Sequence, residues 1–406
     1  MKLNTRAVHA GDRKRAGSQS TKHQSTKQWV PVTAPIYTAA SYFYEDAADL
    51  DRVFANEMPG PSYARHGNPT NEALEELVTS LECGLESGAG ALACSTGMAA
   101  LHIAILTALL DRRRVILAAS ALYGATINML MKVLEPSGIE TIFVDFCDEQ
   151  ALAEAIAEHR PGALLMETIS NPLLRVAPLD RIATMAKEAG AQLIVDNTFA
   201  TPLITRPLDL GATFSVHSLT KYLAGHGDVL GGIIVTTAEN LEPLRSMARS
   251  LGPALGPFEA YLSMRGIKTF PLRMERQCAN ACRLANWLAT HPAIDKVNFP
   301  ADPKHPDAGT IKRLFPPNLY GAILSFEVKG ADREGIFRVM NSLKMIVPAT
   351  SLGDVQTMVL YPAMASHRDL SPKHRARLGI HDNLLRLSTG IEAVEDIIAD
   401  LDQALS

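Results

Sequence analysis

Short apolar runs alternate with longer amphipathic segments through the middle of the chain. Runs such as Gln192–Asp196 have the length of buried strands, and the segments between them repeat apolar positions at helical spacing. This alternation predicts a mostly parallel sheet that is covered by helices on both faces. The strands are expected at Arg114–Ala118, Glu140–Val144, Ala163–Glu167 and Gln192–Asp196, and the helices at Ile127–Leu134, Glu149–Glu158 and Leu179–Ala189.

A helix, a short strand and a tight turn are predicted ahead of these elements. Apolar residues at helical spacing indicate a helix over Asn71–Glu82, and Ser-Thr-Gly-Met at positions 95–98 then leads into a second, apolar helix. A helix N-terminus presents unpaired N–H groups and the positive end of the helix dipole, which makes the turn a candidate phosphate site. Gly97 would let the backbone approach the anion closely. Taken alone the turn is a weak signal, because Ser and Thr begin many helices.

Beyond about Pro257 the pattern changes to that of a smaller α+β unit. Leu385 and Leu387 flank Arg386 on its last strand, so Arg386 points to the opposite face from them. If that face lines a cleft, the guanidinium could clamp a carboxylate; otherwise it is an ordinary surface arginine. The helices are expected at Glu259–Gly266, Arg273–Thr290, Arg333–Leu343 and Ala393–Leu405, and the strands at Ala322–Val328, Met358–Tyr361 and Leu384–Ser388.

The N-terminal part has no regular apolar pattern. Residues 1 to about 30 are rich in Lys, Ser, Thr and Gln and are expected to form a mobile arm. The segment that follows, as far as Pro69, is rich in proline and aromatic residues and is expected to lie against another surface, such as another subunit. These shifts divide the chain into an arm at 1–68, an α/β domain at 69–257 and an α+β domain at 258–406.

Composition and charge argue against several classes of protein. The 406 residues carry a formal net charge of -4, which gives no reason to expect binding to nucleic acid or to an anionic membrane. The longest apolar tract, Met98–Leu110, is interrupted by His102 and is too short to span a bilayer. The first eleven residues lack the apolar centre of a signal peptide, so a cytoplasmic protein is expected.

The five cysteines are interpreted as reduced thiols, because their number is odd and they form no Cys-x-x-Cys pair. Cys278 and Cys282 lie four residues apart on a predicted helix. No nearby histidine completes a metal-binding set, so helix packing is the preferred explanation and no metal is expected.

The strongest chemical signal joins Asp196, at the end of a strand, to Lys221, which lies in a hydroxyl- and glycine-rich segment. Pyridoxal phosphate requires such a pair: a carboxylate that keeps the ring nitrogen protonated, and a lysine that reaches the aldehyde carbon. Ser218 and Thr220 could donate to the cofactor phosphate. The alternatives are a helix-capping Asp and a solvated surface Lys.

Several polar residues fall at the carboxyl ends of the predicted strands, where ligands bind in such sheets. Tyr123, Glu167, Asn171 and Asp196 share this position, which predicts one pocket. Tyr123 could instead be a Tyr packed at a strand end, and Asn171, which precedes a proline, could simply form a turn.

The run Ser-Leu-Thr-Lys-Tyr-Leu-Ala-Gly-His-Gly-Asp at 218–228, after Val-Asp-Asn-Thr-Phe at 195–199, resembles the signature of the Cys/Met-metabolism pyridoxal-phosphate enzymes. That family includes cystathionine γ-synthase, cystathionine γ-lyase, methionine γ-lyase and the homoserine-ester sulfhydrylases. The resemblance runs from about Thr33 to the C-terminal helix. It implies the type I fold of pyridoxal-phosphate transferases, with a seven-stranded sheet between helices, and a homotetramer built from active dimers.

The resemblance also implies roles for individual residues. Backbone amides of Gly97 and Met98 would bind the cofactor phosphate, and Tyr63 and Arg65 would reach the phosphate of a neighbouring subunit. Further implied contacts are Tyr123 stacked on the pyridine ring, Asn171 at the phenolic oxygen or the substrate, Arg386 on the substrate α-carboxylate, and Ser351 near both Lys221 and that carboxylate.

The implied reaction is γ-elimination or γ-replacement on a small-molecule sulfur amino acid or homoserine ester, with Lys221 and Tyr123 as acid–base groups. Methionine γ-lyase, a homoserine-ester sulfhydrylase, cystathionine β-lyase and a homologue that binds the cofactor without turnover remain as alternatives. Asp354 and Gln356 depart from a family motif tied to the distal part of the substrate. Ala125 stands where methionine γ-lyases typically have Cys, which favours a cystathionine-type enzyme.

Overall fold

The computed structural model describes residues 1–12, 31–55, 57–84, 87–365, 368, 375–376 and 379–406. Its centre is a seven-stranded sheet with the strand order β1-β7-β6-β5-β4-β2-β3, in which β2 to β6 run parallel and β7 is antiparallel to both β6 and β1. The predicted mostly parallel sheet is therefore confirmed. The strands are β1 (Gly90–Cys94), β2 (Val115–Ala119), β3 (Glu140–Val144), β4 (Ala163–Glu167), β5 (Gln192–Asp196), β6 (Phe214–Ser218) and β7 (Gly232–Thr236).

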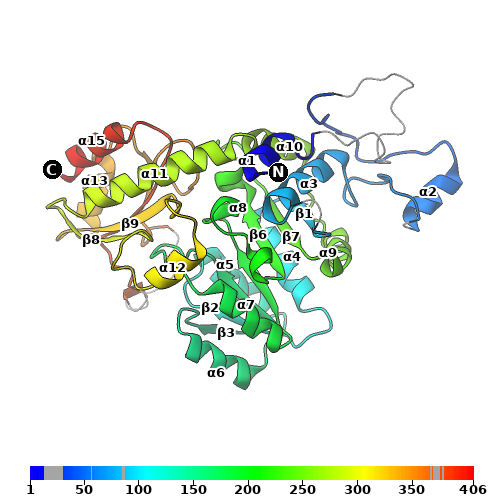
Figure 1. The fold of residues 1–406 in the computed structure, drawn as a ribbon, viewed down its shortest axis with the longest axis horizontal. Coiled ribbons are helices and arrows are strands. Elements are labelled where there is room, and N and C mark those ends of the chain that lie inside the picture. The colour runs from blue at the N-terminus through cyan, green and yellow to red at the C-terminus, as the bar shows by residue number, and fades with distance from the viewer. Residues whose placement is uncertain (13–30, 56, 85–86, 366–367, 369–374, 377–378) are drawn as a thin grey trace.

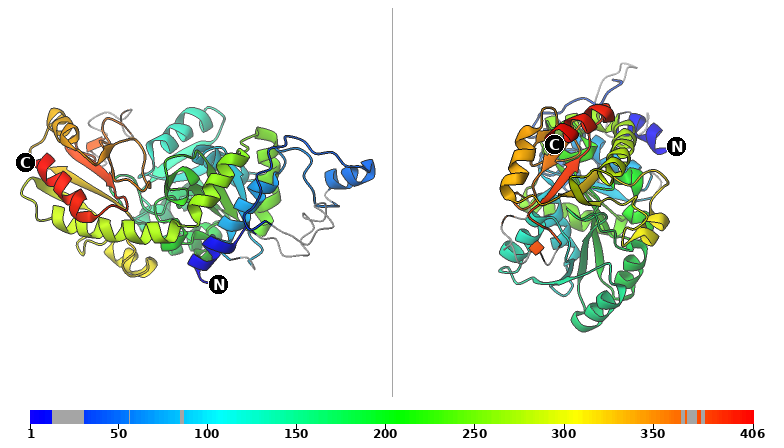
Figure 2. Two further views of the ribbon diagram at one scale, coloured as in Figure 1. Left: turned by 90° about the horizontal axis from the view of Figure 1, so that it is seen from above. Right: turned by 90° about the vertical axis from the view of Figure 1, so that its left-hand side faces the viewer.

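Helices cover both faces of this sheet, as Figures 1 and 2 show. Along β7, Ile233 and Val235 pack in one cluster with the apolar residues of α3, while Ile234 packs in another cluster with those of α4. Alternate residues of a strand point to opposite faces, so α3 and α4 lie on opposite sides of the sheet. The helices of this part are α3 (Pro69–Glu82), α4 (Gly97–Ala108), α5 (Gly124–Met129), η2 (Leu130–Leu134), α6 (Glu149–His159), α7 (Leu179–Glu188), α8 (Thr201–Ile204), η3 (Pro207–Leu210), η4 (Leu219–Leu223) and α9 (Ala238–Leu251).

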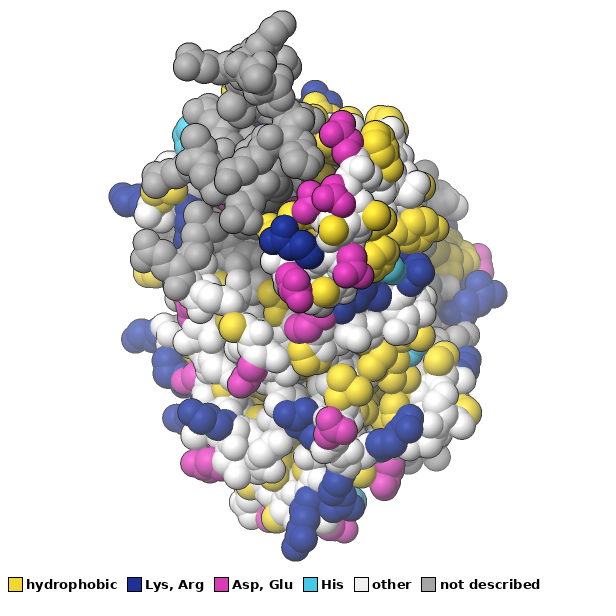
Figure 3. Space-filling model, turned by 90° about the vertical axis from the view of Figure 1, so that its right-hand side faces the viewer, with side chains coloured by type: hydrophobic (Ala, Val, Ile, Leu, Met, Phe, Trp, Pro, Cys, Tyr) yellow, Lys and Arg dark blue, Asp and Glu magenta, His cyan; other side chains and the backbone are white. Residues whose placement is uncertain are grey.

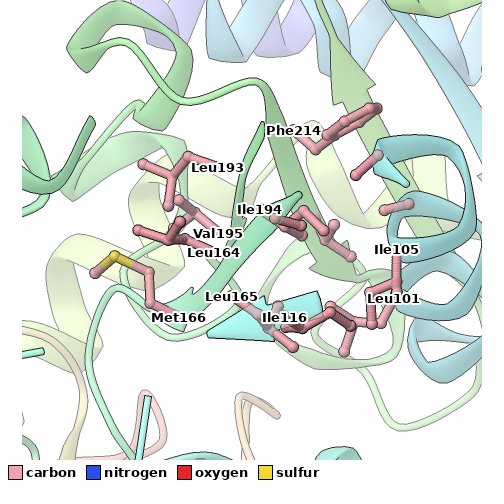
Figure 4. Close-up of a cluster of buried hydrophobic side chains, with 14 of the residues drawn as sticks. Leu101, Ile105, Ile116, Leu164, Leu165, Met166, Leu193, Ile194, Val195 and Phe214 are labelled. Carbon is pink, nitrogen blue, oxygen red and sulfur yellow. The ribbon is translucent and has the colours of Figure 1, made fainter. Parts of the chain in front are cut away.

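The main core lies on both faces of the sheet and includes apolar residues of α4 and of α7. Figure 4 shows Leu101 and Ile105 of α4 close to Ile116 of β2 and to side chains of β4, β5 and β6. Each of these side chains is at most 2% exposed. Burial of these apolar side chains stabilises the strands that carry the site residues.

The second, smaller sheet has the order β10-β11-β12-β9-β8. The 19-residue helix α11 joins the two parts: Phe270, Met274 and Cys278 pack in the core of the first, and Leu284 and Leu288 in that of the second. The elements are α10 (Pro257–Ile267), α11 (Phe270–Leu288), β8 (Ile294–Asn298), α12 (Ala308–Leu314), β9 (Ile323–Val328), α13 (Arg333–Ser342), β10 (Val347–Pro348), β11 (Met358–Leu360), β12 (Leu384–Ser388) and α15 (Val394–Leu405).

The N-terminal segment differs in part from the prediction of a mobile arm. Leu3–His9 form the helix α1, which packs on α3 and buries Ala7 completely. Apolar residues at Leu3, Ala7 and Ala10 give this helix an inner stripe that the polar residues around it obscure in the sequence. Residues 13–30 of the predicted arm lie outside the described residues.

The segment from residue 31 to 68 runs away from the body of the molecule and carries the short helix α2 (Ala47–Phe54), as Figure 1 shows. Phe43 is 88% exposed and Phe54 is 60% exposed. Figure 3 looks onto this end of the molecule, where hydrophobic side chains lie among charged ones.

Candidate active site

A cavity of about 480 Å³ opens at the carboxyl ends of β4, β5 and β6. Parallel strands present their carboxyl ends at one edge of the sheet, and β12 of the smaller sheet adds Arg386, so the cavity brings together residues up to 290 positions apart in the sequence. Side chains and backbone around it come from Gly97, Met98, Tyr123, Glu167, Asn171, Asp196, Ser218, Thr220, Lys221 and Arg386.

Lys221 lies in the one-turn helix η4, directly after β6. Its backbone torsion angles, φ −92° and ψ −135°, are not helical, so the turn is broken at this residue. The Nζ atom donates a hydrogen bond of 3.0 Å to Oγ of Ser351. Burial, together with the positive charge of Arg386, lowers the pKa of Lys221 to about 8. Roughly one-tenth of this amine is therefore neutral and nucleophilic at pH 7, far more than for a lysine with the ordinary pKa.

Arg273, on α11, holds the segment that follows Lys221. Its guanidinium donates to the backbone carbonyls of Tyr222 at 2.9 Å, Leu223 at 3.0 Å and Gly266 at 2.9 Å. A Cβ atom at Gly225, where φ is +72°, would lie 1.8 Å from Nη1 of Arg273. Only glycine fits there, and this close approach fixes the turn that carries the lysine.

Asp196 ends β5, and Glu167 stands opposite it at the end of β4. Oδ1 of Asp196 accepts a hydrogen bond of 3.0 Å from the amide of Thr198. Burial raises the pKa of Asp196, and the Thr198 hydrogen bonds oppose that rise. Burial and the charge of Asp196 raise the pKa of Glu167 well above its ordinary value. Sequence reasoning placed Glu167 at this edge but gave it no role.

Arg386, on β12, is only 3% exposed and points into the cavity rather than to the outer surface. Nη1 donates to Oδ1 of Asn171 at 3.1 Å, and Nη2 donates to the carbonyl of Ser351 at 3.1 Å. Its Nε is buried and has no hydrogen-bond partner among the described atoms. Burial lowers the pKa of Arg386 to about 10. The guanidinium is a cation short of an anionic partner, so an anion is expected to complete its surroundings.

The N-terminus of α4 also borders the cavity. A Cβ atom at Gly97 would lie 3.0 Å from Cβ of Ser218, so the absence of a side chain lets α4 meet the end of β6. The Ser218 amide donates to Oγ1 of Thr198 at 2.9 Å, and Oγ1 of Thr220 accepts from the amide of Gly231 at 3.1 Å. Unpaired helix N–H groups and two hydroxyls thus border the same space, a donor set that suits a phosphate.

A buried polar network lies beneath these strand ends, on the α3 side. Oε1 of Glu82 accepts from Ser215 at 3.0 Å and Asn197 at 3.3 Å, and it bonds to Nε2 of His217. Oγ1 of Thr168 donates to Oδ1 of Asn197 at 2.7 Å. Glu82, Asn197, Ser215 and His217 have no exposed surface. The network ties together residues adjacent in sequence to Glu167, Asp196 and Ser218.

Tyr63 and Arg65 do not line this cavity. They belong to the extended segment, where the guanidinium of Arg65 lies 5.6 Å from the centre of the Tyr63 ring and donates to the carbonyl of Arg249. Tyr63 is 46% exposed, so it is available for contact beyond this chain.

Asp354 and Gln356 also lie outside the residues that line the cavity. Asp354 is buried behind the Lys221 segment, where a Cβ atom at Gly227 would lie 2.5 Å from its Oδ2. Burial lowers the pKa of Arg273 to about 10, and the carboxylate of Asp354 opposes that fall. The negative charge of Asp354 therefore acts on Arg273, the residue that holds the turn of Lys221.

Among the described residues, no group of three or more His, Cys, Asp or Glu side chains is arranged to hold a metal ion. None of the helices in the described ranges combines the length and apolar character needed to cross a bilayer. All five cysteines are described, and all are free thiols.

Comparison with known proteins gives a consistent assignment. The sequence profile described as Cys/Met metabolism PLP-dependent enzyme matches residues 5–406. The chain is 37% identical over 406 residues to the L-methionine gamma-lyase of Fusobacterium nucleatum subsp. polymorphum, with 99% of this chain and 98% of that one covered. The chain belongs to the Cys/Met metabolism family of PLP-dependent enzymes.

Other members of the Cys/Met metabolism family agree in sequence and in fold. The cystathionine gamma-lyase of Bacillus subtilis (strain 168) is 39% identical over 377 residues, which cover 92% of this chain and 94% of that one. A crystal structure of cystathionine gamma synthase from Xanthomonas oryzae pv. oryzae superimposes with a TM-score of 0.87 at 34% identity, covering 100% and 98% of the two chains. This protein is therefore a pyridoxal-phosphate-dependent enzyme of the γ-lyase and γ-synthase type, with the type I fold.

Proposed function

We propose that the chain catalyses γ-elimination or γ-replacement on a sulfur amino acid or a homoserine ester, with cystathionine as the first substrate to test. One observation carries this proposal: a single cavity holds a strand-end carboxylate, a lysine with a lowered pKa and a buried arginine. These are the groups needed to hold the cofactor ring, to move protons and to bind an α-carboxylate.

The donor sets described above fit pyridoxal phosphate. Gly97 and Met98 at the start of α4 would bind its phosphate together with the hydroxyls of Ser218 and Thr220. The Asp196 carboxylate would hold a proton on the ring nitrogen, and Lys221 would bind the aldehyde carbon. When bound, the cofactor supplies an electron sink for the negative charge that develops on the substrate α-carbon.

The substrate end of the cavity is assigned to Arg386. Its two Nη atoms would form a bidentate pair with the α-carboxylate, and Ser351 would lie beside that group. Because Oδ1 of Asn171 accepts from Arg386, the amide nitrogen of Asn171 is left to donate elsewhere, which supports its proposed bond to the phenolic oxygen of the cofactor.

Two residues of this chain would move protons. The neutral Lys221 amine would remove the proton from the substrate α-carbon and carry protons between the α-, β- and γ-positions. Tyr123 follows β2 at the rim of the cavity and is assigned to stack on the ring and to protonate the departing sulfur.

We propose that the active unit is a dimer and that two such dimers form a tetramer. Tyr63 and Arg65 lie outside the cavity of their own chain, on an extended segment with exposed aromatic side chains. They would complete the phosphate site of a neighbouring subunit. We also propose the division into residues 1–68, 69–257 and 258–406, in which α1 is a part of the first segment that packs on its own chain.

The proposed location is the cytoplasm, which suits the five free thiols.

Methionine is the second candidate substrate. The wall of the cavity beyond Lys221 contains Leu230, Leu352, Leu360 and Ala365, a lining suited to a small apolar thioether. Ala125, by contrast, departs from the Cys typical of methionine γ-lyases and favours cystathionine. Asp354 lies behind the lysine turn, so the substrate choice is not attributed to its charge.

A substrate panel tests the proposal. The purified holoenzyme is incubated with cystathionine, methionine and homoserine esters, with and without an added thiol, and the products are identified by mass. γ-Cleavage of cystathionine gives cysteine, 2-oxobutyrate and ammonia, whereas β-cleavage gives homocysteine, pyruvate and ammonia. If pyruvate is the only oxo acid formed, the reaction is β-cleavage and not γ-cleavage. If no substrate of the panel gives a product, the proposal is refuted.

A further inference from the structure

The carboxyl groups of Glu167 and Asp196 are neighbours on adjacent parallel strands. The two residues are paired in register, so their side chains leave the sheet on the same face, on strands separated by about 5 Å. Both line the cavity, and they are the only carboxyl side chains among the described residues around it. Two like charges this close in an enclosed site repel one another, so one proton is expected to remain on the pair.

The ring nitrogen proposed to lie beside Asp196 would stabilise the ionised form of Asp196, so Glu167 is the member expected to keep that proton. Asp196 accepts from the amide of Thr198 at 3.0 Å, and the Thr198 hydroxyl also faces it, so its ionised form is stabilised. Burial and then the charge of Asp196 raise the pKa of Glu167 well above its ordinary value, and the backbone amides of Tyr123 and Asn171 oppose that rise. The other charged groups at this cavity are Lys221, on η4, and Arg386, on β12. His217, on β6, also acts to lower the pKa of Asp196.

Glu167 touches both loops that carry the residues proposed to bracket the cofactor. Its Oε1 accepts a hydrogen bond from the backbone amide of Tyr123, which follows β2. The backbone amide of Asn171, which follows β4, also faces the carboxyl group. One side chain therefore fixes the backbone beneath the ring-stacking tyrosine and beneath the asparagine bonded to Arg386.

We propose that Glu167 is a positioning residue that works as a neutral carboxylic acid: it anchors the Tyr123 and Asn171 backbones and leaves Asp196 as the single negative charge of the pair. The inference rests on the proposed function, in which Asp196 serves the ring nitrogen. The neutral state matters for two reasons. A second anion would compete with the substrate α-carboxylate for Arg386, and it would stabilise the protonated, inactive form of Lys221.

The test compares Glu167→Gln with Glu167→Ala. Gln keeps an acceptor oxygen for the two backbone amides but carries no charge. The Ala variant should lose cofactor affinity and raise KM by about tenfold each, as expected for lost hydrogen bonds, and the Gln variant should recover most of both losses. A Gln variant as impaired as the Ala variant would overturn the proposal, because it would show that the charge is required.

A second readout does not depend on turnover. Infrared difference spectra of the apoenzyme, wild type minus Glu167→Gln, should contain the C=O stretch of a protonated carboxyl group at pH 7. A carboxylate signal in its place would overturn the proposal, even if the Ala variant fails to fold. Failure of the proposed function is distinguishable: it would appear as an inactive wild type, or as Asp196→Asn with unchanged cofactor binding, while the infrared assignment of Glu167 would stand.

Discussion

Nζ of Lys221 donates a hydrogen bond of 3.0 Å to Oγ of Ser351, although 130 residues separate them in the chain. Lys221 follows the last parallel strand of the large sheet, and Ser351 lies between β10 and β11 of the small one. The bond therefore joins the two parts of the molecule at the proposed reactive amine, and it makes the position of that amine depend on how the two parts pack.

The reactivity of Lys221 should follow a pKa of about 8. Below that pH the amine is protonated and unreactive, and above it the amine is neutral. The rate at which the apoenzyme is trapped by pyridoxal phosphate and borohydride should therefore reach half its maximum near pH 8. Arg386→Leu should move this midpoint upward, because removal of a nearby positive charge favours the protonated lysine. A midpoint at the ordinary lysine value in both proteins would contradict the lowered pKa.

Replacement of Lys221 by Ala should leave the fold intact and remove the chemistry. With the described residues the side chain of Lys221 makes one hydrogen bond, and it is not part of the apolar core, so the thermal unfolding curve should change little. Turnover should fall by about 100-fold or more, the range expected for the loss of an acid–base group. The visible absorbance of the bound cofactor should also change. Lys187→Ala, on the exposed face of α7, is the matched control; equal turnover in the two variants would remove Lys221 from the mechanism.

Arg386→Leu should weaken substrate binding more than it slows the catalytic step. A hydrogen bond to a charged group contributes roughly 1.5–3 kcal/mol, which corresponds to an increase in KM of about ten- to a hundredfold. Arg386→Lys keeps the positive charge but loses the planar pair of donors that binds both carboxylate oxygens. Its KM should therefore lie between those of the wild type and the Leu variant. Steady-state kinetics on the best substrate of the panel give both constants. An unaltered KM would place the carboxylate site elsewhere.

Arg65 provides a test of the proposed shared site. Arg65→Ala should lower cofactor retention during dialysis, although Arg65 lies outside the cavity of its own chain. Unfolding and refolding a mixture of Arg65→Ala and Lys221→Ala subunits should restore part of the activity, since a mixed dimer carries one site with both residues intact. If the mixture stays as inactive as its components, each site is built from a single chain.

Removal of the Glu82 carboxylate should destabilise the protein strongly. Glu82→Ala leaves His217, Ser215 and Asn197 buried without their common partner, and loss of one member of a buried pair costs roughly 3–5 kcal/mol. Thermal unfolding should show a lowered Tm. Glu76→Ala, on the same helix and partly exposed, should leave Tm nearly unchanged. Equal stability of the two variants would mean that the network adds nothing to the fold.

The sequence predicted the sheet and the meeting of Asp196 with Lys221, because strand period and strand ends are local properties that parallel pairing brings to one edge. It could not predict that Arg273 binds the turn of Lys221. In the sequence Arg273 resembles a surface arginine on a helix, and only the fold brings it to the carbonyls of Tyr222 and Leu223. Glu167 offered a signal, a carboxylate at a strand end, but its pairing with Asp196 depends on which strands are neighbours. The helix Leu3–His9 was missed because its apolar stripe is short and lies in a polar segment.

The arginine on the last strand is already engaged before any ligand arrives. Arg386 donates to Asn171 and to the Ser351 carbonyl, two neutral oxygens that a carboxylate would displace. Binding of the substrate would then be an exchange of acceptors, which frees Oδ1 of Asn171 when the α-carboxylate is bound. Binding of the α-carboxylate by Arg386 would thereby change the hydrogen bonding of Asn171, the residue proposed to contact the cofactor.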